Sequence, residues 1–547
     1  MHKNKGQALI FTYAVIVFLT ILSIPLLDKI MSERWTAERQ RLERETFYLA
    51  EGGLEDAINQ FTDAIANFQV APNVARYPAT GSINTVYTVS TAFPSGASAS
   101  SVITEAEPSM RTIVDPDGSA IGVKVYTVTS TCQHPMNSTI SATLNQAIIL
   151  RVIYTFQHAV FYNDDLEMLP GPNMNLTGRI HSNSDIYLGT HNTFTVDSEY
   201  LHSAGDIYNR RKDSTQDMEG DVRIRRAGTG AYFNMEQGGV ILDSDSPDWL
   251  TESQTRWNGT VKSSVHGVTE LSTPVVGSIQ PGGYYASNAE VTIENGTITE
   301  NGSPLIEGVD IPAGTIITDN DFYNNREGMN ILMTNIDLSK LAGYANPADA
   351  SPTFPNHLPS NGLIYATRND AGMTEQPGVR LVNGSQIYRN DGLTIVSNDP
   401  VYIQGNYNSV NKKPTAVICD SVNLLSTAWN DADSLLNLNH ANRDAANTTV
   451  NTAFIAGVDN TTTGNYNGGL ENYPRFHEDW SGRTLTIRGA FVELWNTQIA
   501  QGAWVYGSPQ YTAPNRNWDY DSDFNDVNNM PPFTPWAVEA QRTGWWK

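Results

Sequence analysis

The sequence is poor in cysteine and in basic residues. Its 547 residues include only two cysteines, Cys132 and Cys419, which excludes a disulfide-rich scaffold. The two could form one disulfide or remain as two buried thiols, and nothing in their spacing decides between these or suggests a zinc site. Lysine and arginine total 34 against 58 acidic residues, a net charge of -24. Because such a surface repels a polyanion, we expect no nucleic-acid partner.

Catalytic signatures are also missing from the sequence. It contains no GxSxG, HExxH or Walker motif. The acidic cluster of Asp164, Asp165 and Glu167 could serve a polysaccharide-active β-helix enzyme. Paired acids are common on an acidic surface, however, and a fold does not by itself imply an activity. We therefore expect a protein that is not an enzyme.

Only one hydrophobic run is long enough to cross a membrane. The run from Ala8 to Leu27 contains no charge, and as a helix it spans about 30 Å, the thickness of a hydrocarbon core. Charged residues follow it instead of a small-x-small site, so we expect no signal-peptide cleavage there. A single span must be helical in lipid, and Pro25 is expected to kink it near its end. We place the short leader in the cytoplasm and the large polar body across the inner membrane.

The helix is predicted to continue through a charged stretch to residue 66. Pairs four residues apart, such as Arg39 with Glu43, decorate its exposed side. Gly52 and Gly53 interrupt it, so either the helix bends there or another segment approaches closely. Apolar residues recur on one face, which predicts that this half packs against protein. They are Phe47, Leu54, Ile58, Phe61 and Ile65.

The N-terminal residues carry three features in a fixed order. A six-residue basic leader ends at Gly6 and is followed by Gln7, then by the apolar span, then by TyrLeuAlaGluGlyGlyLeuGluAsp at 48–56. With these features, about sixty residues resemble the N-terminal region of PilX-type minor type IV pilins. The resemblance implies that a prepilin peptidase cuts the Gly6–Gln7 bond on the cytoplasmic face. It also implies other pilin subunits and inner-membrane lipid as partners.

One position departs from the pattern of major pilins. Those proteins carry a glutamate five residues after the cleavage site, where this chain has Phe11. Minor pilins of the PilX type can also lack this glutamate, so the resemblance implies a rare subunit at or near a filament tip. The alternative is a permanently anchored envelope binding protein whose Gly6 is never cut.

Composition and strand patterns predict a mainly β body. Charged residues make up only 17%, while the chain has 42 glycines and 27 prolines. Alternating segments over residues 86–156 predict an antiparallel meander like that of a pilin head, with a long hairpin around His134 and Pro135. Residues 148–152 are expected to lie near the apolar face of the helix.

An internal repeat follows the meander. IleHisSerAsnSerAspIleTyrLeu at 180–188 recurs 21 residues later as LeuHisSerAlaGlyAspIleTyrAsn at 201–209. A repeat of this length predicts one turn of an irregular parallel β-helix, in which equivalent residues stack about 4.8 Å apart. The repeated histidines and aspartates, His181, His202, Asp185 and Asp206, could bind a metal. Ladders that satisfy turn hydrogen bonds are the favoured interpretation.

The densest acidic segment lies close to the C-terminus. Its spacing, Asp-x-Asp-x-Asp-x-x-Asp, supplies enough oxygens for calcium, the one cofactor that the sequence suggests. The EF-hand pattern fails because Phe524 and Met530 occupy its glycine and glutamate positions. The four candidate ligands are Asp519, Asp521, Asp523 and Asp526.

These patterns together predict an α+β, mainly β protein. A long transmembrane and amphipathic helix precedes a pilin-like meander and a β-solenoid body, which is displayed for adhesion to a surface or glycan ligand or for assembly. The expected units are a leader at 1–6, the helix at 7–66, the meander at 67–157, the solenoid with insertions at 158–428 and a C-terminal β-rich region at 429–547.

Overall fold

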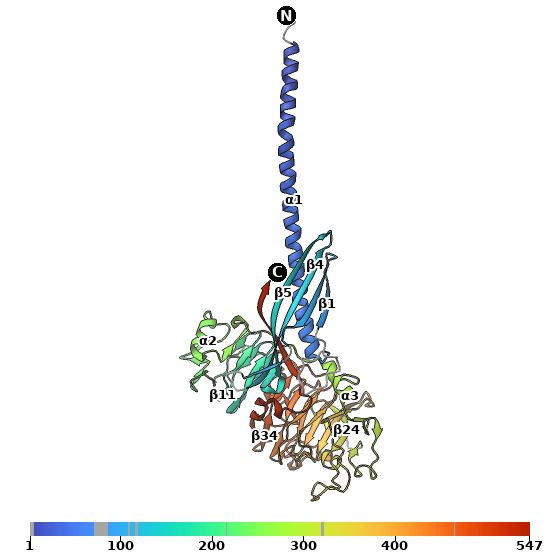
Figure 1. The fold of residues 1–547 in the computed structure, drawn as a ribbon. Helices are drawn as coiled ribbons and strands as arrows, with labels where there is room; N and C mark the ends of the chain where they lie inside the picture. The colour runs from blue at the N-terminus through green and yellow to red at the C-terminus, as the bar shows by residue number, and fades with distance from the viewer. Residues whose placement is uncertain are drawn as a thin grey trace.

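The computed structural model describes residues 5–69, 86–107, 110–114, 119–214, 216–318, 322–463 and 465–546, with only the backbone of Lys5. A long N-terminal helix projects from a largely β body that contains several sheets (Figure 1). Residues 1–4 of the predicted leader lie outside the described residues.

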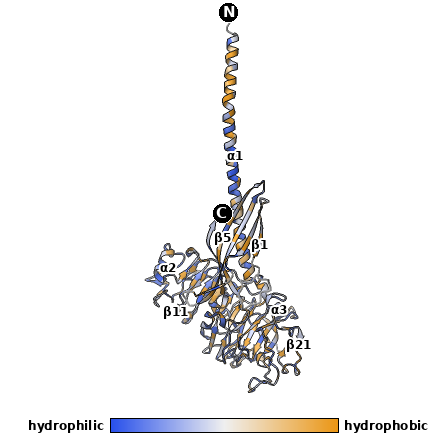
Figure 2. Ribbon diagram, viewed as in Figure 1, coloured by the Kyte–Doolittle hydropathy of each residue, from blue (hydrophilic) through white to orange (hydrophobic). Residues whose placement is uncertain are grey.

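The helix α1 spans Lys5–Ala66 without interruption. Its 62 residues correspond to a length of about 90 Å. It continues through Pro25, and its N-terminal half is an exposed apolar rod (Figure 2). Among the described residues, α1 is the one helix long and apolar enough to cross a membrane. The expected pair of Arg39 and Glu43 is present at 2.8 Å on its exposed surface.

An antiparallel sheet covers the C-terminal part of α1, and we call this unit the head (Figure 1). The strands pair in the order β1–β2–β4–β5–β37, and β3 lies beside β4. The predicted hairpin around His134 is the β4–β5 pair. The strands are β1 Val86–Ala92, β2 Ser98–Glu105, β3 Arg111–Val114, β4 Ala120–His134, β5 Asn137–Tyr154 and β37 Trp536–Trp546.

The apolar face of α1 packs on this sheet as the sequence predicts. Leu54 and Ile58 are buried in one core with Ile148 and Leu150 of β5. Phe47, nearer the exposed apolar half, is partly buried against the same core. Each large apolar side chain buried in this way contributes about 1.5–3 kcal/mol, so the contact with the sheet fixes the direction of the helix.

The last strand of the chain completes the head. In β37, Trp536 pairs with Tyr154 of β5, and the antiparallel register continues to Trp546 opposite Asn145. The sequence alone predicts only that this segment belongs to a β-rich C-terminal region. The head is therefore built from both ends of the chain, with the body between them.

The first part of the body is a stack of parallel strands over residues 158–262, which we call the first stack. Its strands fall into three sheets. The antiparallel β15 Tyr232–Asn234, the β16–β17 hairpin (Glu236–Gln237 and Val240–Ile241) and helix α2 Trp249–Trp257 extend it. The parallel strands are β6 His158–Tyr162, β9 Arg179–Ser182, β12 Leu201–Ser203 and β18 Val261–Lys262; β7 Leu166–Met168, β10 Ile186–Leu188 and β13 Ile207–Tyr208; and β8 Met174–Thr177, β11 Thr193–Asp197 and β14 Asp221–Arg225.

A second stack of parallel strands occupies residues 291–493, with β36 Asn515–Tyr520 added to one of its sheets. Short antiparallel strands lie at its edges, including the hairpin of β19 and β20. The strands are β19 Val291–Glu294, β25 Leu363–Thr367, β27 Leu393–Val396, β29 Thr415–Cys419, β32 Ala453–Ala456 and β35 Phe491–Glu493; β24 Met329–Asp337, β26 Glu375–Val382, β28 Val401–Gln404, β30 Val422–Leu425 and β33 Pro474–Phe476; β31 Thr448–Asn451 and β34 Thr484–Gly489; with β20 Thr297–Glu300, β21 Ser303–Pro304, β22 Ile316–Ile317, β23 Phe322–Asn324 and helix α4 Leu338–Leu341.

The two stacks share one continuous sheet. Its 12 strands run in the order β18–β12–β9–β6–β35–β32–β29–β27–β25–β19–β20–β21. The chain therefore moves outward from β6 to β18, passes to the far end at β19, and returns strand by strand until β35 pairs with β6. Residues 263–290, which we call the crossover, connect the two ends and include helix α3 Tyr284–Asn288.

The 21-residue repeat forms stacked ladders in the first stack. His181 pairs in parallel register with His202, and the rings of Tyr187 and Tyr208 lie 5.1 Å apart. The backbone amide of Asp206 donates to Asp185 Oδ1 at 2.8 Å, as that of Asp185 does to Asp165 Oδ1 at 3.0 Å. The aspartates thus connect the segments that precede β7, β10 and β13 through hydrogen bonds.

The adjacent glycines Gly52 and Gly53 of α1 mark a close approach rather than a bend. A Cβ atom on Gly53 would collide with the Cβ atom of Ala99 and lie 2.9 Å from Ser130 Oγ. The Gly53 carbonyl accepts a hydrogen bond from Ser101 Oγ at 2.9 Å. A Cβ atom on Gly52 would meet only the ring edge of Phe93, at 3.1 Å.

Replacing Gly53 with alanine should therefore separate the helix from the sheet. We expect Gly53→Ala to lower the free energy of unfolding by about 1–3 kcal/mol, because overpacking outweighs the helix propensity gained. Gly52→Ala should cost less, since the ring of Phe93 can move. Urea unfolding of the full chain in detergent, followed by tryptophan fluorescence, measures both. Equal stability of the two variants would contradict the close approach.

Candidate functional site

The predicted processing site lies at the free end of α1. Gly6 and Gln7 belong to its first turn, far from the body (Figure 1), and a Cβ atom placed on Gly6 would meet no described atom beyond its own stretch of helix within 4 Å. The side chains of Ala8, Phe11 and Leu27 are exposed along the same rod. This segment is accessible to lipid, to an enzyme or to another helix.

The other end of α1 is held by a cluster of aromatic residues. Trp536 Nε1 donates a hydrogen bond to the carbonyl of Ile65 at 3.0 Å. The ring of Phe68 stacks on Tyr284 of the crossover, with centroids 3.8 Å apart, and meets Tyr285 and Trp536 edge-on. The end of the helix, the last strand and the crossover therefore meet at one point, which we call the junction.

The backbone of Phe68 shows how strongly the junction is determined. Its φ of +61° lies in the left-handed region that usually favours glycine after a helix. That conformation costs about 1–2 kcal/mol for a residue with a Cβ atom. It persists because the ring is almost completely buried among its aromatic neighbours.

The crossover is also attached to the head by hydrogen bonds. Ser272 pairs with Val538 of β37 in an antiparallel bridge, and its hydroxyl lies 3.3 Å from Thr62 Oγ1 of α1. The amide of Val275 donates to Asn67 Oδ1 at 3.0 Å. Polar and aromatic contacts thus fix the crossover under the head.

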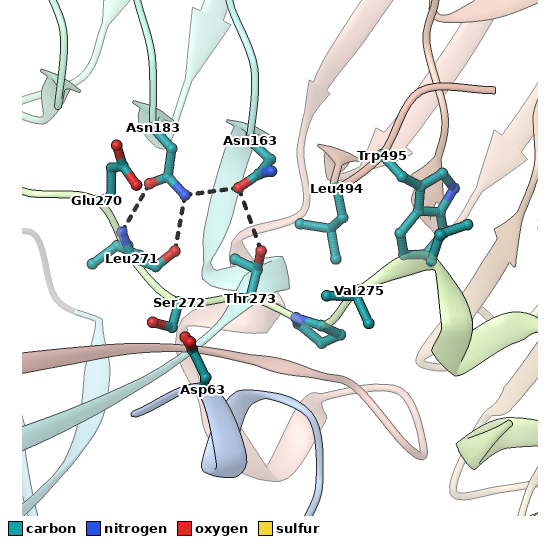
Figure 3. Close-up of a pocket in the computed structure, with 12 residues that line it drawn as sticks. Asp63, Asn163, Asn183, Glu270, Leu271, Ser272, Thr273, Val275, Leu494 and Trp495 are labelled. Carbon is teal, nitrogen blue, oxygen red and sulfur yellow. Dashed lines mark hydrogen bonds between the residues drawn. The ribbon is translucent and has the colours of Figure 1, made fainter. Parts of the chain in front are cut away.

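A pocket of about 370 Å³ opens where the crossover passes the two stacks (Figure 3). Asn183 forms one wall, and its side chain bonds both the amide and the carbonyl of Leu271, at 2.9 and 2.8 Å. It also donates to Asn163 Oδ1 at 2.9 Å. The side-chain amide of Asn183 pairs with the backbone of Leu271 as a neighbouring strand would. It thereby holds the crossover against the first stack.

The contact between the two stacks contains a buried carboxyl group. Glu493, at the end of β35, accepts hydrogen bonds on Oε2 from the amides of Asn163 and Asp164, at 3.0 and 3.2 Å. Burial, and then the charge of Asp164, raises the pKa of Glu493 to about 8. This side chain is therefore largely protonated at neutral pH.

The three acids considered for an enzyme lie in different surroundings. Asp165 pairs with Lys212 at 2.7 Å and accepts the hydroxyl of Ser184. Glu167 is buried, and burial raises its pKa to about 7. Asp164 lies beside Glu493 at the contact between the stacks.

The four candidate calcium ligands contact different groups of the protein, except that two of them share one lysine. Asp521 and Asp523 both pair with Lys412, at 2.7 and 2.9 Å. Asp519 accepts from the amide and hydroxyl of Thr177, and Asp526 caps a short helix. Among the described residues, no three His, Cys, Asp or Glu side chains are grouped so that they could hold a metal ion.

Calcium binding at these aspartates stays a prediction. Such a site would raise the melting temperature of the full chain in millimolar calcium relative to EDTA, because only the folded state would bind the ion. The double variant Asp519→Asn/Asp523→Asn should abolish that rise. An unchanged melting temperature of the wild type would contradict the prediction.

The two cysteines are free thiols. Cys132 is buried on β4 in the head, and Cys419 is buried on β29 in the second stack. Burial raises the pKa of both thiols. The alternative of a disulfide between them is not realised.

Sequence reasoning did not identify the junction. Phe68, Tyr284 and Trp536 come from three distant segments, and no local spacing connects them. The one available signal is the alternation of Trp536 and Val538 with smaller residues in an aromatic tail, which indicates a strand without revealing its partner.

Comparisons with known proteins identify no family for this chain. No family model and no curated protein matches the chain. A solved structure to which it is similar is the competence-associated pilin ComZ from Thermus thermophilus, with 8% sequence identity and a TM-score of 0.27. The alignment covers 92% of this chain and 97% of that one. At this TM-score the similarity carries no argument about function.

The protonated carboxyl of Glu493 predicts how stability depends on pH. The ordinary pKa is 4.5, so between pH 4.5 and 8 the folded chain keeps a proton that the unfolded chain loses. The stabilisation that comes from this bound proton is fully present below pH 4.5 and is lost as pH rises through 8. Glu493→Gln should flatten this decline, because glutamine cannot ionise.

Urea unfolding from pH 4 to 9 tests the prediction. Glu236→Gln, at an exposed carboxylate, is the matched control and should keep the wild-type slope. A Glu493→Gln variant with that same slope would show that the proton is bound elsewhere.

Proposed function

We propose that the protein is a minor-pilin-like subunit of a type IV pilus or a related filament. The observation that carries the proposal is the division of α1 into an exposed apolar half and a half packed on an antiparallel sheet. The first half suits lipid and neighbouring helices, where van der Waals contact drives association. The second half supports a separate body.

The subunit is placed at or near the tip of the filament. Phe11 supplies no carboxylate to pair with a neighbour's N-terminal amine, so the subunit needs no fixed register on a subunit below it. Residues 158–535 form a body much larger than the head, and a tip has room for it (Figure 1). The body is displayed there for adhesion or for initiating assembly.

The body is proposed to be an irregular β-helix. Parallel pairing of the main strands of the two stacks and the register of residues 21 apart support this architecture. Its irregularity comes from the crossover and from insertions between strands of the second stack.

The proposed order of membrane insertion, cleavage and assembly follows from the N-terminal helix. The chain is inserted with its leader in the cytoplasm and its body across the inner membrane. A prepilin peptidase cuts after Gly6, and Gln7 becomes the N-terminus. The subunit then leaves the lipid with other pilins and reaches the cell surface.

Two alternatives use the same structure differently. In the first, the protein is a permanently anchored envelope protein whose body binds a ligand. In the second, the body is a polysaccharide-active enzyme, which would require turnover that Asp165→Asn abolishes. The packing of α1 against the head is compatible with both, so processing is the feature that separates them from a pilin.

N-terminal sequencing of protein sheared from whole cells tests the proposal. We expect Gln7 as the first residue of the wild type. Gly6→Val should leave the leader attached, because the peptidase cuts after glycine. Gly52→Ala, a glycine of the same helix outside the cleavage site, should still be processed. An intact leader on the wild-type protein, found only in membrane pellets, would favour the anchored alternative.

A further inference from the structure

A second pocket, of about 450 Å³, lies between the head and the first stack. One wall is the face of the head sheet that points away from α1, with Arg151 of β5 and Glu539 of β37. The opposite wall comes from the first stack and includes Arg179, Tyr200 and Lys262. Its volume falls within the range of small-ligand sites in proteins.

Three cations gather in this pocket although the chain has a net charge of -24. Arg151 faces Glu539 across 3.6 Å, and Arg179 lies over the ring of Tyr200. Lys262 has no ion-pair partner within the part of the chain that the structure describes, and its side chain is half-buried. An ammonium group held at a pocket wall without a carboxylate is a ready partner for an anionic ligand.

The histidines of the pocket are neutral. Burial lowers the pKa of His202, and the charges of Lys262 and Arg179 lower it further. Burial also lowers the pKa of His181 to about 4. Its Nε2 lies 3.0 Å from Asn183 Oδ1, which can only accept, so Nε2 carries the proton. The positive charge of the pocket therefore belongs to lysine and arginine.

The pocket also contains groups that accept hydrogen bonds. Glu199 and Glu539 line it with carboxylates, and Asn258 and Gln541 add amides. A small inorganic anion would contact only the cations and would leave most of the volume empty. A ligand with a carboxylate and several hydroxyl groups matches both kinds of wall.

We propose that this pocket binds an acidic sugar, with its carboxylate at Lys262 and Arg179 and its hydroxyl groups toward Glu199 and Glu539. The inference deepens the proposed adhesive function. It rests on that function only for the identity of the surface that carries the sugar. In a filament whose α1 helices lie along the axis, the sheet face opposite α1 points outward. The pocket would then be open to a cell surface.

Isothermal titration calorimetry with the full chain in detergent tests the proposal. The charged probes are trigalacturonate, a hyaluronan tetrasaccharide and sialyllactose. Their neutral partners are the methyl ester of trigalacturonate, chitotetraose and lactose, and inorganic phosphate is the ion control. We expect at least one charged sugar to bind about tenfold more tightly than its neutral partner and than phosphate, since one charge-assisted hydrogen bond supplies that difference.

Lys262→Gln should weaken binding of that sugar about tenfold with an unchanged melting temperature. Lys413→Gln, which removes a lysine of the second stack that bonds Asn390, is the matched control and should bind as the wild type does. The proposal is overturned if no charged sugar binds better than its neutral partner, if phosphate binds equally well, or if Lys262→Gln has no effect. An uncut N-terminus would refute the pilin proposal and leave these results unaffected.

Discussion

The position of the whole body relative to the exposed apolar rod of α1 depends on the hydrogen bond from Trp536 to the carbonyl of Ile65 and on the aromatic packing around it. Helix ends leave carbonyl groups without intrahelical partners, and here a side chain of the last strand satisfies one of them. Phe68 then turns into the left-handed region and stacks on the crossover. Helix, sheet and body are thus held together there by direct contacts among described residues.

The parts that sequence reasoning recovered are those written in local periodicity. The apolar face through Leu54 and Ile58 packs where the 3.6-residue pattern places it. The alternation on both sides of His134 gives the β4–β5 hairpin, and the repeat containing His181 and His202 gives parallel register. Gly53 was marked as either a bend or a close approach, and the sheet provides the approach.

The parts of the fold that sequence reasoning missed depend on contacts between distant segments. No pattern in the β37 segment specifies β5 as its partner, because an edge strand accepts any strand of suitable register. Likewise, β6 has a free edge that β35 fills only after the chain has passed through the second stack. The pocket between the head and the first stack arises where these long-range pairings bring Arg151 and Lys262 to opposite walls, so no spacing along the chain could have revealed it.

The closing of the head by β37 has a mechanical consequence. The strands of the head run roughly along α1 (Figure 1), and β5 leads through residues 155–157 directly into β6 of the body. Tension applied along the helix therefore loads the β5–β37 hydrogen bonds in shear, where many must break together, instead of opening them one at a time. Such a connection can transmit a pulling force between the helix and whatever the body contacts.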